Sequence, residues 1–319
     1  MDFIIPFLLL VFGFVLLVKG ADLFVDGASS IAKFFKVSSL VIGLTVVAFG
    51  TSLPEAAVSI SASIAGVDDV SLGNIVGSNI FNILFILGLS AVIVPQIVHG
   101  DLLSRDFLFS ILSALILIPF YYFIGEDHSI SRMEGAILLI IFLGFLYSVF
   151  KHSKQTELLE IETINPKYPI KKALLITLLG LVGIVFGGVI VTNAAREIAI
   201  KLGMSEWLVG LTIVSIGTSL PELVTSVVAA IKKESEIAIG NVVGSNIFNV
   251  LFILGFSATI SPIRVNASAL FDVLFLLIIS IITYLFALSS RKISRIEGLF
   301  MFLSYMAYMA YIIIRDLNG

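Results

Sequence analysis

Residues 50–55 read Gly-Thr-Ser-Leu-Pro-Glu, and residues 217–222 repeat the same six residues. Each copy places a carboxylate and a proline inside an otherwise apolar stretch. A second pair has the same 167-residue spacing: Gly-Asn-Ile-Val-Gly-Ser-Asn-Ile-Phe-Asn at 73–82 and Gly-Asn-Val-Val-Gly-Ser-Asn-Ile-Phe-Asn at 240–249. One offset serves both motifs, so the two halves of the chain are a duplicated unit. Hydrophobic segments interrupted at corresponding positions of two repeats are typical of a transporter's binding site.

The composition predicts an integral membrane protein. Hydrophobic residues make up 59% of the 319 residues and charged residues only 13%, with a mean hydropathy of +1.13. Soluble domains carry about a quarter of charged residues. The apolar runs lack the alternation of outer-membrane barrels, so we expect an all-α protein. Ten segments are each near the roughly 20 residues that cross a bilayer as helix: about 3–33, 39–65, 70–95, 106–124, 133–151, 170–200, 206–231, 237–261, 268–288 and 294–314.

These segments divide the chain into a first five-helix repeat at 1–151, a polar cytoplasmic linker at 152–169 and a second five-helix repeat at 170–319. Because each repeat has an odd number of spans, the two repeats should lie in the membrane in opposite orientations. With both termini outside, thirteen Lys and Arg residues fall on the cytoplasmic side and five on the external side. The positive-inside rule therefore predicts an N-out, C-out protein of the cell membrane.

The repeated hexamers point to a binding role for their glutamates. A carboxylate in the middle of a bilayer costs at least about 2.5–3.5 kcal/mol, which favours a functional reason for its presence. On a helix, Thr51 and Ser59 lie one turn before and one turn after Glu55, and equivalent residues surround Glu222. Pro54 lacks the N–H that would bond the carbonyl of residue 50, so we expect a broken helix with free backbone oxygens there.

The repeated decamers add a second set of oxygen ligands. Each predicts one narrow polar helix face with spacing i, i+4, i+8, formed by Asn74, Ser78 and Asn82 and by Asn241, Ser245 and Asn249. The chain has no cysteine and therefore no thiolate site. Carboxylate, hydroxyl, amide and carbonyl oxygens without a soft ligand favour Na⁺ or Ca²⁺ over Zn²⁺ or Cu⁺.

These motifs resemble the α-repeats of the sodium/calcium exchanger family, in its prokaryotic type without a large regulatory loop. The likeness covers essentially the whole chain and implies ten helices in two inverted halves, with cation sites at the membrane midplane. It implies that Glu55 and Glu222 bind both Ca²⁺ and Na⁺, and that the first helices of the two halves slide to alternate access. The remaining ligands that the resemblance implies are Thr51 and Thr218 beside the calcium site, Ala48, Ser52, Ser78, Ser215, Ser219 and Ser245 at the sodium sites, and Asn82 and Asn249 at the central position.

One position departs from part of the family. Potassium-dependent members have Asp where this chain has Asn249. The amide lowers the largest possible charge of the site from −3 to −2, which favours an exchanger that does not need potassium.

The function that these observations favour is exchange of Na⁺ for Ca²⁺ by a membrane antiporter, which is not an enzyme and has no cofactor besides the transported ions. A divalent cation/H⁺ antiporter of the same architecture is the alternative, in which the two glutamates exchange protons. A cation channel would need a continuous pore, and an intramembrane hydrolase would need paired catalytic aspartates, a Ser–His pair or a zinc motif. No basic patch indicates a nucleic-acid partner, and the sequence identifies no protein partner.

Overall fold

The computed structural model describes residues 3–100, 102–120, 129–156, 166–204, 213, 215–265 and 267–317. Most of the expected linker and the start of the expected span 206–231 lie outside these residues. The first half contains, in chain order, α1 (Ile4–Phe35), α2 (Ser39–Ile42), the π-helix η1 (Gly43–Val47), α3 (Ala48–Thr51), α4 (Leu53–Ile64), α5 (Asp68–Ile80), the π-helix η2 (Phe81–Leu87), α6 (Gly88–Ile93), β1 (Gln96–Ile97), the π-helix η3 (Leu102–Asp106), α7 (Phe107–Leu115), α8 (Leu117–Pro119), β2 (Ser129–Ile130) and α9 (Arg132–Thr156).

The second half repeats this order. It contains α10 (Ile170–Lys201), α12 (Ser215–Thr218), α13 (Leu220–Ile231), α14 (Ser235–Ile247), the π-helix η7 (Phe248–Leu254), α15 (Gly255–Ile260), β3 (Ile263–Arg264), α16 (Ala267–Ser290), β4 (Lys292–Ile293) and α17 (Arg295–Leu317). The helices α4 and α13, α5 and α14, and α6 and α15 begin and end at positions 167 residues apart, as do the π-helices η2 and η7. The repeat in the sequence is therefore a repeat in the structure.

The helical fold of a membrane protein is confirmed, and its described part has eight helices long and apolar enough to span a bilayer. A ninth is the pair Ser39–Thr51 and Leu53–Ile64, if its two pieces, bent by 50°, cross as one span. These nine correspond to nine of the ten expected segments. Of the tenth, 206–231, the described part includes the 12-residue apolar helix α13.

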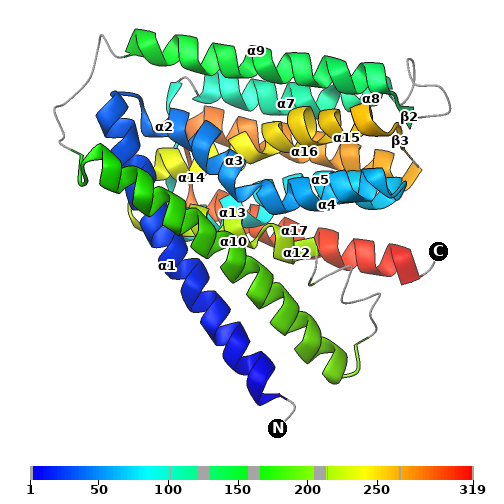
Figure 1. Cartoon of the computed structure of the whole chain (residues 1–319). Helices are drawn as coiled ribbons and strands as arrows, with labels where there is room; N and C mark the ends of the chain where they lie inside the picture. Colours follow the sequence, from blue (N-terminus) through cyan, green and yellow to red (C-terminus); the bar gives the residue numbers. More distant parts are fainter. Residues whose placement is uncertain are drawn as a thin grey trace.

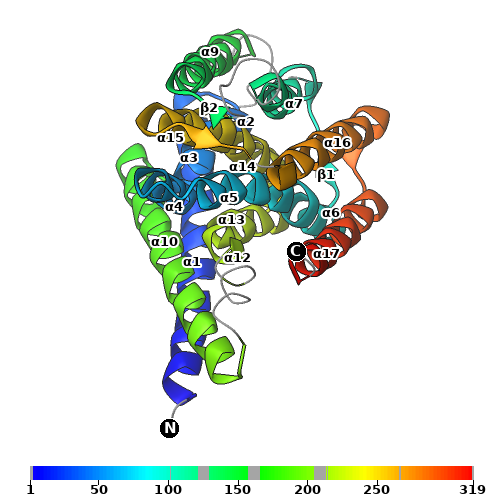
Figure 2. The ribbon, with the colours of Figure 1, turned by 90° about the vertical axis from the view of Figure 1, so that its right-hand side faces the viewer.

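The two long helices α1 and α10 lie side by side and extend away from the other helices (Figures 1 and 2). Glycines allow their backbones to approach closely. A Cβ atom on Gly20 would lie 2.8 Å from the nitrogen of Ile184, and one on Gly180 would lie 2.5 Å from the nitrogen of Phe24. Real Cβ atoms do not approach backbone so closely, so larger residues would separate the two helices.

The remaining helices form a core in which the halves are interleaved. The strand β1 pairs with β4 and β2 pairs with β3, each pair joining one half to the other. Directly after β2 and β4, the helices α9 and α17 begin with the same capping box. The backbone nitrogen of Ser131 donates to Glu134, and that of Ser294 donates to Glu297, at 2.6 and 2.7 Å. Consequently α9, the last helix of the first half, packs on α15, and α17 packs on α6.

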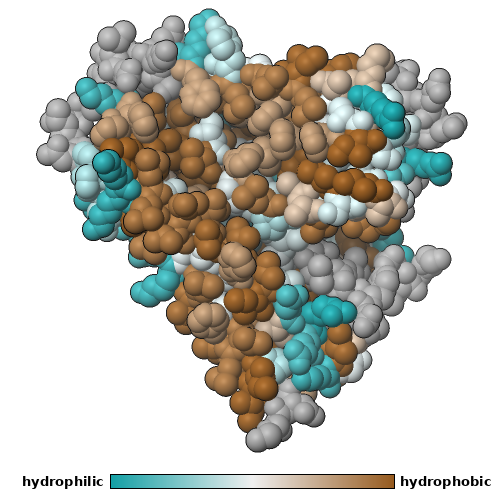
Figure 3. All heavy atoms as spheres, viewed as in Figure 1, coloured by the Kyte–Doolittle hydropathy of each residue, from teal (hydrophilic) through white to brown (hydrophobic). Residues whose placement is uncertain are grey.

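Large apolar side chains cover much of the outer surface. Figure 3 shows them on the core helices and along the α1–α10 pair. On the two long helices they include Phe7, Leu8, Phe12, Leu178 and Phe186, each more than half exposed. In water such a surface would be costly, whereas lipid tails are as apolar as these side chains.

Candidate cation site

The expected break in the first hexamer is present. The helix α3 ends at Thr51, Ser52 leaves helical geometry with φ −82° and ψ 8°, and α4 restarts at Leu53 with Pro54 in its first turn. Proline suits this place because a first-turn N–H has no partner within the helix. The second hexamer behaves alike, with Ser219 at φ −91° and ψ 7° between α12 and α13.

The two glutamates lie in the first turns of the helices that restart, at the positive ends of their dipoles. Glu55 and Glu222 are each only 1% exposed. Each accepts a hydrogen bond from the other half: Ser219 Oγ donates to Glu55 Oε1 at 2.8 Å, and Ser52 Oγ donates to Glu222 Oε1 at 2.9 Å. The serine at each break therefore supports the carboxylate of the opposite repeat.

Each glutamate also has an oxygen without a partner. Oε2 of Glu55 and Oε2 of Glu222 are buried and have no hydrogen-bond partner among the residues that the structure describes. Leaving an ionised carboxylate oxygen in this condition costs on the order of several kcal/mol. A cation bound between the two halves would supply the missing interaction.

Asparagines of the decamers support the broken helices. Asn74 Nδ2 donates to Ser59 Oγ at 2.9 Å and to the carbonyl of Glu55 at 3.3 Å. Asn241 Nδ2 repeats these contacts with Ser226 and the carbonyl of Glu222, at 2.9 and 3.4 Å.

The threonines connect these asparagines across the halves. Thr51 Oγ1 donates to Asn241 Oδ1 at 2.9 Å, and Thr218 Oγ1 donates to Asn74 Oδ1 at 3.4 Å. Like the serines, each threonine therefore bonds a residue of the opposite half, and these bonds hold both helix breaks in the same arrangement.

Two further oxygens without partners come from the ends of the decamers. Asn82 in η2 and Asn249 in η7 are each 1% exposed, and the Oδ1 atom of each accepts no hydrogen bond from a described residue. Their Nδ2 atoms donate to Asn246 Oδ1 and to Asn79 Oδ1, at 3.0 and 2.9 Å. With Oε2 of each glutamate, four buried carboxylate and amide oxygens of the repeated motifs have no hydrogen-bond partner within the described ranges.

The other expected ligands have different environments. Ser78 Oγ lies 3.1 Å from Ser219 Oγ, while Ser245 Oγ is buried without a hydrogen-bond partner. The carbonyl of Ala48 accepts from the nitrogen of Ser52 at 3.1 Å. The side chain of Ser215 lies outside the described residues.

Two residues of this region were not identified from the sequence. Asn79 and Asn246 directly follow the predicted serines and therefore lie off the expected i, i+4, i+8 stripe. Their repetition in both decamers was the available signal. No group of three or more His, Cys, Asp or Glu side chains forms a metal cluster in the part of the chain that the structure describes. Neutral oxygens must therefore supply most of the ligands of any cation bound here.

Comparisons with known proteins agree with this geometry. The family model described as sodium/calcium exchanger protein matches residues 5–151 and 172–314. The chain is 32% identical over 346 residues to the sodium/calcium exchanger MaX1 of Methanosarcina acetivorans, covering 96% of this chain and 97% of MaX1. It is 36% identical over 269 residues to the inner membrane protein YrbG of Escherichia coli, covering 82% of each.

A solved structure of the sodium-calcium exchanger NCX_Mj, soaked with zero Na⁺ and Ca²⁺, superposes with a TM-score of 0.85 and 34% identity, covering 97% of this chain and 99% of the other. Fold, repeats and family match agree over nearly the whole length. This chain belongs to the sodium/calcium exchanger family and is a multi-pass transmembrane antiporter.

Proposed function

We propose that this antiporter exchanges Na⁺ for Ca²⁺ at a site between α4, α13, η2 and η7. The observation that carries the proposal is a set of four buried carboxylate and amide oxygens, two of each kind, that have no hydrogen-bond partner in the described part of the chain. Oxygen ligands of this kind suit hard cations. The name of the relative MaX1, a sodium/calcium exchanger, supports the same pair of ions.

The charge of the site favours mutually exclusive binding. If both glutamates are ionised, their charge of −2 is neutralised by one Ca²⁺ or by two Na⁺, so either occupant removes the attraction for the other. Ser52 and Ser219 already hold one oxygen of each carboxylate, and their own oxygens are candidate Na⁺ ligands. Sodium beyond the second ion would make the exchange electrogenic.

The same proposal includes ten spans in two inverted halves, with segment 206–231 as the seventh. Access to the site would alternate as α1 and α10 slide across the core. Two features support this mechanism: the close glycine contact within the pair, and the extension of part of the pair away from the other helices.

We place both termini outside the cell membrane. Three contacts, at two places, support the grouping of the loops on which this orientation rests. Asp68 accepts from the backbone nitrogen of Arg264 at 3.2 Å, so these two expected external positions lie at one end of the molecule. Lys167 of the linker and Lys232 both bind Asp26, so these two expected cytoplasmic positions lie together as well.

The test is ⁴⁵Ca²⁺ uptake into proteoliposomes that contain the purified protein. Vesicles loaded with Na⁺ are diluted into medium without Na⁺, and matched vesicles contain K⁺, choline or a pH step instead. We expect uptake to require the outward Na⁺ gradient. Uptake that follows the pH step and ignores Na⁺ would establish the cation/H⁺ alternative, and flux without any counter-ion would indicate a channel.

A further inference from the structure

The amides of Asn79 and Asn246 are held in one orientation by backbone carbonyls. Asn79 Nδ2 donates to the carbonyl oxygen of Asn246 at 3.1 Å, and Asn246 Nδ2 donates to the carbonyl oxygen of Asn79 at 3.4 Å. A carbonyl oxygen can only accept, so the nitrogen of each side chain must face it. Both side chains are 2% exposed, which leaves no water to stabilise the flipped amide.

This orientation determines that of the next amides. The Oδ1 atoms of Asn79 and Asn246 must face away from the carbonyls, and an oxygen there can only accept. The neighbouring groups are therefore the nitrogens of Asn249 and Asn82, at 2.9 and 3.0 Å. Once those nitrogens are engaged, the oxygens of Asn249 and Asn82 are the atoms left without partners.

We infer that Asn79 and Asn246 are positioning residues for cation binding, each acting through an asparagine of the other repeat. Asn79 turns the oxygen of Asn249 toward the cation, and Asn246 does the same for Asn82. The inference rests on the proposed function only in requiring that these oxygens bind a cation. Without the positioning bond, an amide can turn by half a revolution and present its NH₂ group, which repels a cation.

A double-mutant cycle tests whether Asn79 acts through Asn249. Calcium binding to the purified protein is measured by calorimetry for Asn79→Ala, Asn249→Ala and the double variant. We expect each single substitution to weaken binding about tenfold and the double variant to weaken it by about the same tenfold, because Asn249→Ala leaves no amide to orient. The matched control pairs Asn79→Ala with Asn82→Ala, whose effects should multiply.

Asn79→Asp keeps the shape of the side chain and still accepts from Asn249. Its second oxygen faces the carbonyl oxygen of Asn246, which favours the protonated acid as the donor there, and in this form the variant should bind Ca²⁺ about as tightly as the wild type. Multiplying effects in the first cycle, or Asn79→Asp as weak as Asn79→Ala, would make Asn79 a merely structural residue. If the wild type binds Ca²⁺ but does not transport it in exchange for Na⁺, Na⁺ is not the coupling ion, and the test of Asn79 still stands. A wild type that binds neither cation overturns both proposals.

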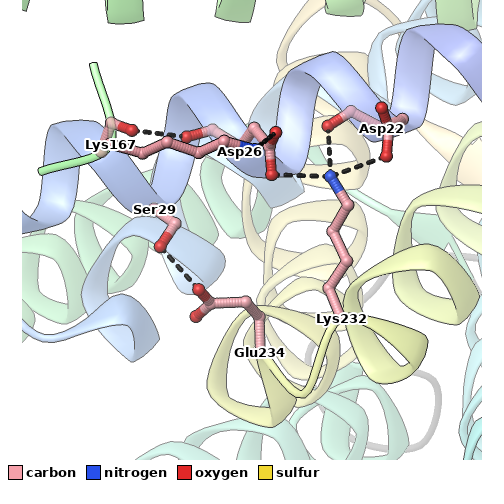
Figure 4. A network of polar contacts seen from close by, with 7 residues as sticks. Asp22, Asp26, Ser29, Lys167, Lys232 and Glu234 are labelled. Carbon is pink, nitrogen blue, oxygen red and sulfur yellow. Dashed lines mark hydrogen bonds and ion pairs between the residues drawn. The ribbon is translucent and has the colours of Figure 1, made fainter.

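A separate observation concerns one end of α1. Lys232, directly after α13, places its Nζ 2.7 Å from Asp22 Oδ1 and 2.6 Å from Asp26 Oδ1, both on α1 (Figure 4). Lys167 binds the other oxygen of Asp26, and this bond raises the pKa of Lys167. We call Asp22, Asp26, Lys167 and Lys232 the α1 clasp. Beside it, Ser29 Oγ donates to Glu234 Oε1 at 2.7 Å.

The clasp has no counterpart in the other half. At the offset of 167 residues, Val189 replaces Asp22, Asn193 replaces Asp26 and Ala65 replaces Lys232. The ion pairs therefore connect the α1–α10 pair to the core at one end, and the corresponding residues of the other end cannot form them. Asp26 and Lys232 have side chains only 17% and 23% exposed, so solvent screens this pair incompletely.

We propose that the α1 clasp holds this end of the molecule closed and biases the antiporter toward the state seen here. Ser30 on α1 is 1% exposed at this end, and Ser30→Cys introduces the only thiol of the chain. Its labelling by an impermeant maleimide in proteoliposomes or detergent reports opening. Lys232→Met should speed the labelling about fivefold, because the ion pairs of Lys232 with both aspartates are lost and only the pair between Lys167 and Asp26 remains.

Arg315→Met is the matched control. It removes an ion pair with Asp272 between α17 and α16, whose side chains are similarly shielded at 29% and 17% exposed, and should leave the labelling rate unchanged. Asp26→Asn is the second test variant, since its shape is preserved, and it should act like Lys232→Met. Unchanged labelling in both folded clasp variants would overturn the proposal. The readout needs no transport, so its failure is separate from a failure of the proposed exchange.

Discussion

At the centre of the molecule the two halves place the same atoms against each other, whereas at the ends of α1 and α10 they place different ones. Ser52 meets Glu222 as Ser219 meets Glu55, within 0.1 Å of the same distance. Asp26 meets Lys232, yet the equivalent positions hold Asn193 and Ala65.

The difference separates two tasks. A site that must bind the same ions from either side of the membrane benefits from equal halves. The balance between the two access states depends instead on what holds each end closed, and any inequality there shifts that balance. Predictions about the centre should therefore come in symmetric pairs, and predictions about the ends should not.

The largest effect should come from the glutamates. Glu55→Gln and Glu222→Gln should each reduce Na⁺-driven Ca²⁺ uptake about a hundredfold or more, because one negative charge cannot balance Ca²⁺ in a buried site. Both variants should fold, since a neutral amide is cheaper to bury. Glu297→Gln, which alters only the cap of α17, is the matched control. Uptake within about twofold of wild type in either variant would remove that residue from the ligand set.

The next effect tests the symmetry of the centre directly. Ser52→Ala and Ser219→Ala each remove a hydrogen bond to a buried carboxylate, an interaction worth about 1.5–3 kcal/mol. We expect each substitution to raise the Na⁺ concentration needed for half-maximal Ca²⁺ uptake at least about tenfold, and by similar factors. Ser280→Ala is the control, because the hydroxyl of this buried residue donates to the carbonyl of Leu276 on its own helix. A large effect of one serine and none of the other would show that the halves are not equivalent in binding.

A smaller effect, at Asn249, tests how many negative charges the central site carries. Wild-type exchange should proceed with K⁺ absent from both sides of the vesicle, since the site lacks a third carboxylate. Asn249→Asp should strengthen cation binding or make uptake depend on pH, because the new charge would face Glu55 and Glu222 and be repelled by them. Measured Ca²⁺ affinity and a pH profile decide. Transport only with K⁺ would refute the first expectation, and unchanged affinity and profile in the variant would place Asn249 outside the site.

Much of the fold and of the candidate site could be predicted from the sequence, because the informative residues are polar or helix-breaking residues within apolar segments. A glutamate and a proline in an apolar run are expensive, so Glu55 and Pro54 identified the break before the structure placed it at Ser52. Because the same residues recur 167 positions later, each residue of one half could be matched to its equivalent in the other. Nine of the ten expected spans also have matching helices or, for 39–65, a bent pair.

The missed features depend on contacts between distant segments. Asn79 was not identified from the sequence, because its proposed positioning role depends on a carbonyl 167 residues away. Asp22 and Asp26 fall within the expected span 3–33 and Lys232 on the expected cytoplasmic side, and nothing in the local sequence brings α1 to the turn after α13. The i, i+4, i+8 stripe assumed a regular α-helix, whereas π-helices begin at Phe81 and Phe248 and change the register of the last asparagine.

The smallest expected effect comes from building an equivalent ion pair at the other end of the molecule. Ala65 and Asn193 are exposed and occupy the positions equivalent to Lys232 and Asp26, so Ala65→Lys with Asn193→Asp would build a second clasp between α10 and the core. The new pair can form only when that end closes. It should therefore favour the opposite access state by about 0.2–1 kcal/mol, the range for partly exposed ion pairs. Labelling of Ser30→Cys should then rise up to about fivefold at low salt and return toward the parent rate at high salt, where screening weakens the pair.

Ala65→Lys alone and Asn193→Asp alone are the controls, because each adds a charge without its partner. If the double variant labels no faster than either single variant, the inequality of the two ends does not govern access.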